Sequence, residues 1–267
     1  MKENLVASRV NVGTNVVTIE QDYPKISVVI PARNEAQNLS HVLPYIPPSV
    51  SEVILVDGQS TDDTVAVAEQ LMPSIRIIKQ KGRGKGDALR IGFAACTGDI
   101  IVMLDADGST DPREIPCFVE ALKAGRDFAK GSRFVKGGGS HDLTFLRQCG
   151  NLCLNKLVNI LFSAGFSDLC YGYNAFWRYC LNDISVDCDG FEVETLISLR
   201  MHKARFKIVE VASFEYPRVH GQSNLQTFRD GWRVLKTILK ERLGNVQVSA
   251  EKQLLFGELS AEKRLIR

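Results

Sequence analysis

The stretch DIIVMLDADG, residues 99–108, decides the fold because an unbroken apolar run stops there at two carboxylates. A short apolar run bounded by polar residues is typical of a strand covered on both faces in a parallel sheet. We therefore predict a long central strand over residues 99–107. Asp105 and Asp107 would stand at the carboxyl end of that strand.

Three further apolar runs precede this one, and each is followed by a helical pattern. The runs are ISVVIPA (26–32), EVILVDG (52–58) and IRIIKQ (75–80), and the helical stretches are residues 35–46, 62–72 and 87–96. This alternation predicts an α/β fold with a mainly parallel central sheet flanked by helices, of the Rossmann-like nucleotide-binding type. Ligands of such sheets bind at the carboxyl ends of the strands, so the polar residues after each run should line one cleft.

The second half of the chain is less regular. Residues 131–142 contain three consecutive glycines and predict a mobile loop, and residues 143–162 predict a helix or a broken helix. A helix over residues 192–203 and a strand over residues 207–213 follow. We divide the chain into an N-terminal arm (1–24), one main domain (25–226) and a C-terminal amphipathic helical tail (227–267).

Composition and charge exclude several classes of protein. The 267 residues are 45% hydrophobic and 24% charged, and 33 basic against 31 acidic residues leave a net charge of +2. A nearly neutral globular chain has no overall field that would attract nucleic acid. No window approaches the ~20 apolar residues of a spanning helix, and the seven cysteines contain no CxxC pair. We expect a cytoplasmic protein without a secretion signal, a zinc cluster or a disulfide framework.

The tail carries an apolar set and a basic set of residues, each at helical spacing. The apolar set is Phe228, Trp232, Leu235, Leu239 and Leu243, and the basic set is Arg229, Arg233, Lys236 and Lys240. Such a helix packs on the main domain or on a second subunit of a homodimer, or it lies on an anionic membrane surface. The pattern alone leaves these alternatives open.

Three clusters carry residues suited to binding a nucleotide diphosphate. Asp105 and Asp107 can share a hard divalent cation such as Mg²⁺ or Mn²⁺, although DADGSTDP is also a good turn sequence. Asp57, at the end of EVILV, can accept hydrogen bonds from a base or ribose. The loop Lys81-Gly82-Arg83-Gly84-Lys85 offers glycine backbone and cations to an anion, or is simply a solvated basic loop.

Taken together, these segments resemble the family 2 glycosyltransferases of GT-A fold, and most closely the dolichyl-phosphate mannosyltransferase group. The resemblance covers about residues 25–226. It is carried by Pro31-Ala32-Arg33-Asn34-Glu35, VDGQSTDDT (56–64), Lys85-Gly86, the stretch 87–107, Gly131-Ser132-Arg133, SDLCYGYNAFWR (167–178), GFEVETLISLR (190–200) and KIVEVASFEYPRVHGQSNL (207–225).

The resemblance implies a role for each matching residue. Pro31, Asn34, Glu35 and Asp57, with the neighbouring Arg33, would line the nucleoside part of the donor. Asp105 and Asp107 would hold the metal of a DXD motif, and Lys85 and Arg133 would meet phosphate oxygens. Arg218, His220 and Ser223 would close over the donor and acceptor phosphates. Glu194 matches a glutamate of the family pattern, and Glu192 lies beside it.

The implied function is metal-dependent, inverting transfer of a sugar from a GDP- or UDP-linked donor. The acceptor is either a polyprenyl phosphate, with the enzyme peripheral at the cytoplasmic membrane face, or a soluble hydroxyl compound. Asn224 stands where the group has a lysine, which keeps both alternatives open. A hydroxyl acceptor needs a general base, for which Asp168, Glu192 and Glu194 are the candidates. A non-catalytic nucleotide-sugar binding module is the remaining alternative.

Overall fold

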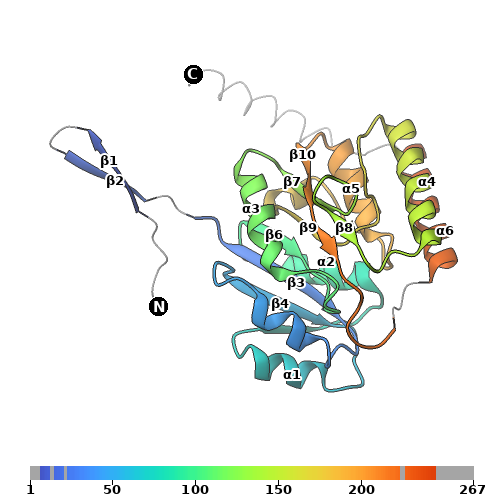
Figure 1. Cartoon of the computed structure of the whole chain (residues 1–267), viewed down its shortest axis with the longest axis horizontal. Helices are drawn as coiled ribbons and strands as arrows, with labels where there is room; N and C mark the ends of the chain where they lie inside the picture. The colour runs from blue at the N-terminus through green and yellow to red at the C-terminus, as the bar shows by residue number, and fades with distance from the viewer. Residues whose placement is uncertain (1–6, 13–14, 21–22, 223–225, 245–267) are drawn as a thin grey trace.

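The computed structural model describes residues 7–12, 15–20, 23–222 and 226–244, and it is built around a seven-stranded sheet of order β10-β7-β9-β6-β3-β4-β5 (Figure 1). The four strands and two of the three helices predicted for the first half are confirmed. They are β3 (Ile26–Ala32), β4 (Glu52–Asp57), α1 (Thr64–Leu71), β5 (Arg76–Lys79), α2 (Lys85–Ala95) and β6 (Ile100–Met103). These four strands run parallel, with β3 between β4 and β6. The fold is therefore α/β with its predicted strands in parallel register.

The central strand is shorter than predicted. It ends at Met103, and only the amide of Leu104 continues the ladder, donating to the Val29 carbonyl oxygen at 3.1 Å. Beyond it, the Asp107 carboxylate accepts hydrogen bonds from the amide and the hydroxyl of Ser109, at 3.0 and 2.6 Å. These local bonds turn the backbone away from the sheet, so both aspartates lie in the loop that follows the strand.

The helix predicted over residues 35–46 is wrong. Two single 3₁₀ turns, η1 (Leu39–His41) and η2 (Leu43–Tyr45), stand there instead. Pro44 has no amide hydrogen, and Pro47 and Pro48 follow at once, so an α-helix could not continue through this stretch. Leu39, Val42 and Leu43 are nevertheless buried, which explains the apolar spacing that suggested a helix.

Strands of the second half complete the sheet. β7 (Phe128–Ser132) pairs with β10 (Ile208–Ala212) in parallel, and β9 (Asn174–Trp177) runs antiparallel between β6 and β7. Neither β9 nor α3 (Ile115–Lys123) was predicted. The loop predicted over residues 131–142 is wrong at two places. Gly131 and Ser132 finish β7, and β8 (Gly139–Ser140) pairs with β11 (Phe214–Glu215).

Side chains alternate between two apolar layers on the faces of the sheet. On one face Val28, Ile30 and Leu55 pack with Phe118 and Leu122 of α3. The residues of the other face include Val29, Ile54 and Met103 and pack with Leu89 and Phe93 of α2 and Val193 and Ile197 of α5 (Val193–Lys203). This double coverage explains the continuous apolar runs in the sequence.

Helices α4 (Phe145–Phe162) and α6 (Thr227–Leu243) lie side by side at one side of the sheet (Figure 1). α6 packs on the domain through Val234 and Ile238, and Glu241 beside them forms ion pairs with Arg200 and Lys203 of α5. Of the alternatives left open for this helix, packing on the main domain is what the structure shows, but not through the Phe228 to Leu243 set, because Phe228 is 80% and Leu243 is 83% exposed. Trp232 and Leu239 of the set are exposed as well, whereas Leu235 is half-buried.

Within the described ranges, no helix has both the length and the apolarity that crossing a membrane requires. At the N-terminus, β1 (Ala7–Val12) and β2 (Asn15–Glu20) form an antiparallel two-stranded sheet of their own. The division into an arm, a main domain and a tail stays a prediction. Residues 245–267 of the predicted tail, together with Ser223 and Asn224, lie outside the described residues.

Candidate active site

Two adjoining cavities lie at the carboxyl ends of the strands. The larger, of about 520 Å³, extends over the ends of β3, β4 and β6, and we call it the donor cavity. The smaller, of about 240 Å³, lies between α4 and α6, and we call it the acceptor cavity. Six residues line both: Lys85, Asp105, Asp107, Phe191, Arg218 and Asp230. They form a shared wall, which is where ligands of the two cavities would meet.

Most of the predicted donor residues line the donor cavity, but Asp57 and Asn34 are not in its lining. Pro31, Arg33 and Glu35 are in the lining. Asp57 is 6% exposed, and its Oδ1 accepts a hydrogen bond from the Ser60 amide at 3.1 Å. Asn34 adopts a positive φ of 58°, and its Oδ1 accepts from the Thr61 amide at 2.8 Å. Both side chains therefore hold the loop after β4.

Lys85 joins two carboxylates in the shared wall. The first residue of α2, it places Nζ 2.6 Å from Asp105 Oδ1 and 2.7 Å from Glu194 Oε1. Burial lowers the pKa of Lys85, but the two carboxylates outweigh burial and the net pKa is raised. Burial raises the pKa of Glu194 against the opposing effect of Lys85. A Cβ on Gly172 would lie 2.8 Å from Lys85 Nζ, so a larger residue there would displace the ammonium from its present position.

Arg218 makes the matching bridge on the other side of the wall. Its guanidinium pairs with Glu35, and Nη1 lies 3.4 Å from Asp107 Oδ2. Burial raises the pKa of Glu35, while hydrogen bonding from Asn38 and the charge of Arg218 oppose it. His220, which follows two residues later, is exposed and lies in neither lining, although its amide donates to Asn38 Oδ1 at 2.9 Å.

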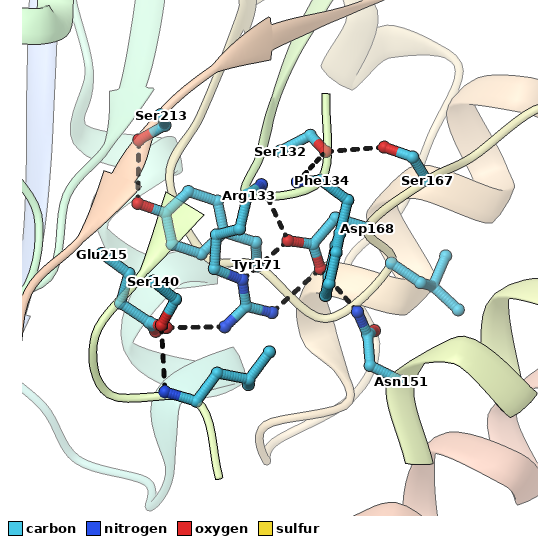
Figure 2. Close-up of polar contacts among 12 residues, drawn as sticks. Ser132, Arg133, Phe134, Ser140, Asn151, Ser167, Asp168, Tyr171, Ser213 and Glu215 are labelled. Carbon is cyan, nitrogen blue, oxygen red and sulfur yellow. Dashed lines mark hydrogen bonds and ion pairs between the residues drawn. The ribbon is translucent and has the colours of Figure 1, made fainter. Parts of the chain in front are cut away.

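Arg133 lies at the floor of the acceptor cavity, held by two acids (Figure 2). Nε donates to Asp168 Oδ2 at 2.7 Å, Nη2 to Asp168 Oδ1 at 2.9 Å and Nη1 to Glu215 Oε2 at 2.9 Å. Its guanidinium carbon also lies 4.9 Å from the centre of the Tyr171 ring. Burial raises the pKa of Asp168, but Arg133 outweighs it and the pKa is lowered.

The same cluster ties down the segment that was predicted as a loop. Ser140 Oγ donates to Glu215 Oε2 at 2.5 Å, and Asn151 Nδ2 of α4 donates to Asp168 Oδ1 at 3.0 Å (Figure 2). Arg133, Glu215 and Asp168 thus connect β7, β11 and α4. The consequence is a guanidinium with a fixed orientation beside the shared wall.

The acceptor cavity has a polar floor and apolar sides that the sequence did not reveal. Leu143, Leu146 and Leu154 line it from α4 and the preceding turn, and Val234 lines it from α6. Arg147 lines it too, with Nη1 3.7 Å from Asp142 Oδ2, a looser pairing than those of Arg133. The spacing of residues 147, 151 and 154 places them on one helical face, a signal that could have indicated this lining.

Two predicted candidates for a general base are poorly placed. Glu192 lies in neither lining, and its Oε1 accepts from the Gly190 amide at 3.2 Å. Asp168 is fully buried and committed to Arg133. Glu194 does line the acceptor cavity, with a side chain that is 4% exposed.

Comparison with known proteins identifies the family to which the chain belongs. The pattern of Glycosyl transferase family 2 matches residues 27–184, more than half of the chain. Glycosyltransferase AglJ of Haloferax volcanii is 30% identical over 211 residues, 77% of this chain and 68% of that protein. Dolichol-phosphate mannosyltransferase of Pyrococcus furiosus is 30% identical over 217 residues. That match spans 76% of this chain but 59% of the relative, less than two thirds of its length.

A solved structure shares the fold. Glucosyl-3-phosphoglycerate synthase from Mycobacterium tuberculosis, in complex with Mn²⁺, UDP-glucose and phosphoglyceric acid, is 26% identical, with a TM-score of 0.65. The match covers 82% of this chain and 80% of that one. The family pattern, the relatives and the mainly parallel sheet agree. The chain is a glycosyltransferase that belongs to family 2 and has the GT-A fold.

Proposed function

We propose that this enzyme moves a sugar from a nucleotide diphosphate sugar to a polyprenyl phosphate, with inversion and with the help of a divalent metal. The observation that carries the proposal is the shared wall between the cavities. A donor in the polar cavity and a lipid phosphate in the cavity with apolar sides would meet at Asp105, Asp107 and Lys85. Relatives at 30% identity include a dolichol-phosphate mannosyltransferase and a polyprenol monophosphomannose synthase.

Asp105 and Asp107 suit Mg²⁺ or Mn²⁺. Their side chains are 28% and 26% exposed and line both cavities. In the described part of the chain no three or more His, Cys, Asp or Glu residues are grouped to hold a metal by themselves. These ions bind through one or two carboxylates plus substrate phosphates, so we propose that the metal binds together with the donor. When bound, it would neutralise charge on the leaving diphosphate.

Different residues of the chain would bind different parts of the donor. Pro31 and Arg33 would contact the nucleoside, and Lys85 and Arg218, which pairs with Glu35, lie beside the two aspartates and would contact the diphosphate. Lys85 retains a third ammonium hydrogen besides the two directed at Asp105 and Glu194, so it can donate to a phosphate oxygen without losing either carboxylate. Asp57 and Asn34 would act as positioning residues for the loop that closes the nucleoside end.

The acceptor cavity fits an amphipathic molecule. Arg133 and Arg147 offer cations to a phosphate, while Leu146, Leu154 and Val234 offer apolar contact to the first part of a hydrocarbon chain. A phosphate monoester is already an anion at neutral pH, so its oxygen can attack the anomeric carbon without a base. Attack comes from the acceptor cavity as the bond to the diphosphate breaks toward the donor cavity. Opposite sides of approach and departure give inversion.

A soluble hydroxyl acceptor is the second candidate, and Glu194 is the observation that favours it. This carboxylate lines the acceptor cavity, and burial raises its pKa toward the range of a general base. The ion pair with Lys85 opposes that role, because it stabilises the ionised form and keeps Oε1 at 2.7 Å from Nζ.

A donor screen followed by product analysis tests the proposal. Thermal shift with UDP- and GDP-linked sugars, each with and without Mn²⁺, should identify one donor that stabilises the protein only when metal is present. Mass spectrometry of reactions with a short polyprenyl phosphate should then show a glycosyl phosphate product, and the anomeric coupling in NMR should show inversion. Transfer to hydroxyl compounds alone would select the second candidate.

A further inference from the structure

Helix α4 carries apolar residues on both of its sides. On the side that faces the domain, Val158 is fully buried beside Asn151 and Asn155, which are each 4% exposed. Asn155 Nδ2 donates to the Ser167 carbonyl oxygen at 2.6 Å, and its Oδ1 accepts from the Leu169 amide at 2.7 Å. On the opposite side Phe145 is 81% and Ile160 is 69% exposed. A helix that only covers a domain keeps its large apolar side chains on the inward side.

Helix α6 has two apolar faces. Val234 and Ile238 pack against the domain, while Phe228, Trp232 and Leu243 are 80%, 56% and 83% exposed. Because α6 packs beside α4, the outer sides of the two helices form one surface (Figure 1). We call it the α4–α6 face, and it comprises Phe145, Leu146, Leu152, Ile160, Phe228, Trp232, Leu239 and Leu243. Exposed apolar patches of this kind mark a surface that binds a partner.

Charge on these two helices identifies the kind of partner. Their acids are Asp230 and Glu241, both 6% exposed and engaged in ion pairs. Their cations are Arg147, Lys156, Arg229, Arg233, Lys236, Lys240 and Arg242, of which Arg147 also lines the acceptor cavity and Arg229 and Arg233 the donor cavity. The other four are exposed, so the charge that reaches solvent around the apolar patch is positive. A second copy of the chain, bound face to face about a twofold axis, would bring these cations together, which disfavours a homodimer through this surface.

The acceptor cavity borders this face at Leu146, which belongs to both. Leu154 lines the cavity on the α4 side, and Thr227 and Val234 line it on the α6 side. A molecule that reached Arg133 past Leu146 would pass between the two outward apolar stripes. The surface and the cavity therefore suit a partner that is apolar inside and anionic at its boundary.

We propose that the α4–α6 face docks on the surface of an anionic lipid bilayer. The apolar side chains enter the boundary between headgroups and acyl chains, and the surrounding lysines and arginines contact anionic headgroups. Docking places the mouth of the acceptor cavity at the lipid surface. The proposal extends the proposed function, but the docking itself involves neither donor nor acceptor.

Vesicle sedimentation tests the docking without any substrate. The full chain is mixed with vesicles of phosphatidylcholine alone, or of phosphatidylcholine with one quarter phosphatidylglycerol by composition. We expect the anionic vesicles to bind at least about tenfold more tightly. Lys236→Glu with Lys240→Glu, and separately Trp232→Ser with Ile160→Ser, should each weaken that binding by at least about tenfold.

Matched variants away from the face control for charge and apolarity. Lys79→Glu on β5 and Leu71→Ser on α1 change exposed residues of the same types and should leave vesicle binding unchanged. Melting temperatures within a few degrees of the parent show that each variant is folded. Equal binding to neutral and anionic vesicles, no binding, or equal losses in the control variants would overturn the proposal. So would concentration-dependent dimerisation in ultracentrifugation that the Trp232 variant abolishes, without vesicle binding.

Transfer assays separate this proposal from the proposed function. A parent that binds anionic vesicles but transfers no sugar to polyprenyl phosphate supports the docking surface and rejects the acceptor. If the parent transfers sugar to a short polyprenyl phosphate in detergent but does not bind vesicles, the result supports polyprenyl phosphate as the acceptor and rejects the docking surface.

Discussion

At the scale of single residues, the site holds each of its central cations between two carboxylates. Lys85 lies between Asp105 and Glu194, and Arg133 lies between Asp168 and Glu215. Such pairing fixes the direction of the cation and leaves it charged in a place where few water molecules reach. Donor and acceptor phosphates would therefore meet cations whose orientation was set by folding.

Asp107→Asn tests the metal assignment. The substitution keeps the shape of the side chain and its acceptance of the Ser109 amide, but removes the charge that a hard cation needs. We expect Mn²⁺-dependent affinity for the nucleotide diphosphate to fall at least tenfold in calorimetry, about 1.4 kcal/mol. The exposed Asp63→Asn is the matched control and should bind as the parent does. An Asp107 variant with undiminished affinity would remove this residue from the metal site.

Asp168→Asn tests the buried pair with Arg133. The folded-state pKa of Asp168 is lowered, so the stability it contributes is present above the unfolded value of about 3.9 and is lost as pH falls through the folded value. At pH 7 the variant should lose about 3 kcal/mol in urea unfolding, because a buried guanidinium loses its ionised partner. Below pH 4 the difference between parent and variant should shrink. A loss that is constant with pH would contradict the ion pair.

At the scale of elements, the sequence predicts the strands and central helices because their patterns are local. Residues 26–32 form β3 over the predicted range, since burial on both faces demands a continuous apolar run. Residues 35–46 mislead because buried Leu39 and Leu43 mimic helical spacing, while Pro44 forbids the helix. The antiparallel β9, NAFW, begins with a polar residue and lacks the continuous apolar run that revealed β6, IIVM, of the same length.

The same distinction holds for the candidate site, where the sequence predicts some residues and leaves others unassigned. Asp105 and Asp107 could be predicted, because both follow β6, and the sequence shows where its apolar run stops. Arg147, Leu154 and Val234 could not be assigned to one cavity, because only the packing of α4 beside α6 brings them together. Which side of α6 is buried also depends on that packing, since both of its sides are apolar.

Asn155→Ala tests the buried asparagine contacts on the inward side of α4. The substitution leaves the Ser167 carbonyl and the Leu169 amide without their partner in a buried setting. We expect a loss of about 2 to 4 kcal/mol in the free energy of unfolding. Lys156→Ala, the exposed neighbour on the same helix, should cost less than about 0.5 kcal/mol. Equal effects of the two variants would show that the asparagine contacts do not anchor the helix.

At the scale of the whole molecule, donor, acceptor and docking surfaces lie in sequence along one route. The strand ends form the donor cavity, the shared wall joins it to the acceptor cavity, and that cavity borders the α4–α6 face at Leu146. An acceptor with a phosphate at one end and a hydrocarbon chain at the other would fit this route from the wall outward. A small polar acceptor would leave the apolar sides unused.

Glu194→Gln distinguishes the two acceptor classes. Glutamine can still hydrogen-bond to Lys85 through its amide oxygen, but it cannot take a proton at neutral pH. A phosphate acceptor brings its own negative charge, so transfer to polyprenyl phosphate should keep at least about a tenth of the parent rate, the remaining loss reflecting the altered charge around Lys85. A hydroxyl acceptor must lose its proton in the transition state, so its transfer should fall by about 10²- to 10⁴-fold. The rates of the variant and of the parent are measured with each acceptor under saturating donor and Mn²⁺. A rate for polyprenyl phosphate that collapses with the hydroxyl rate would make Glu194 necessary to the reaction itself, and the proposed base-free attack would be wrong.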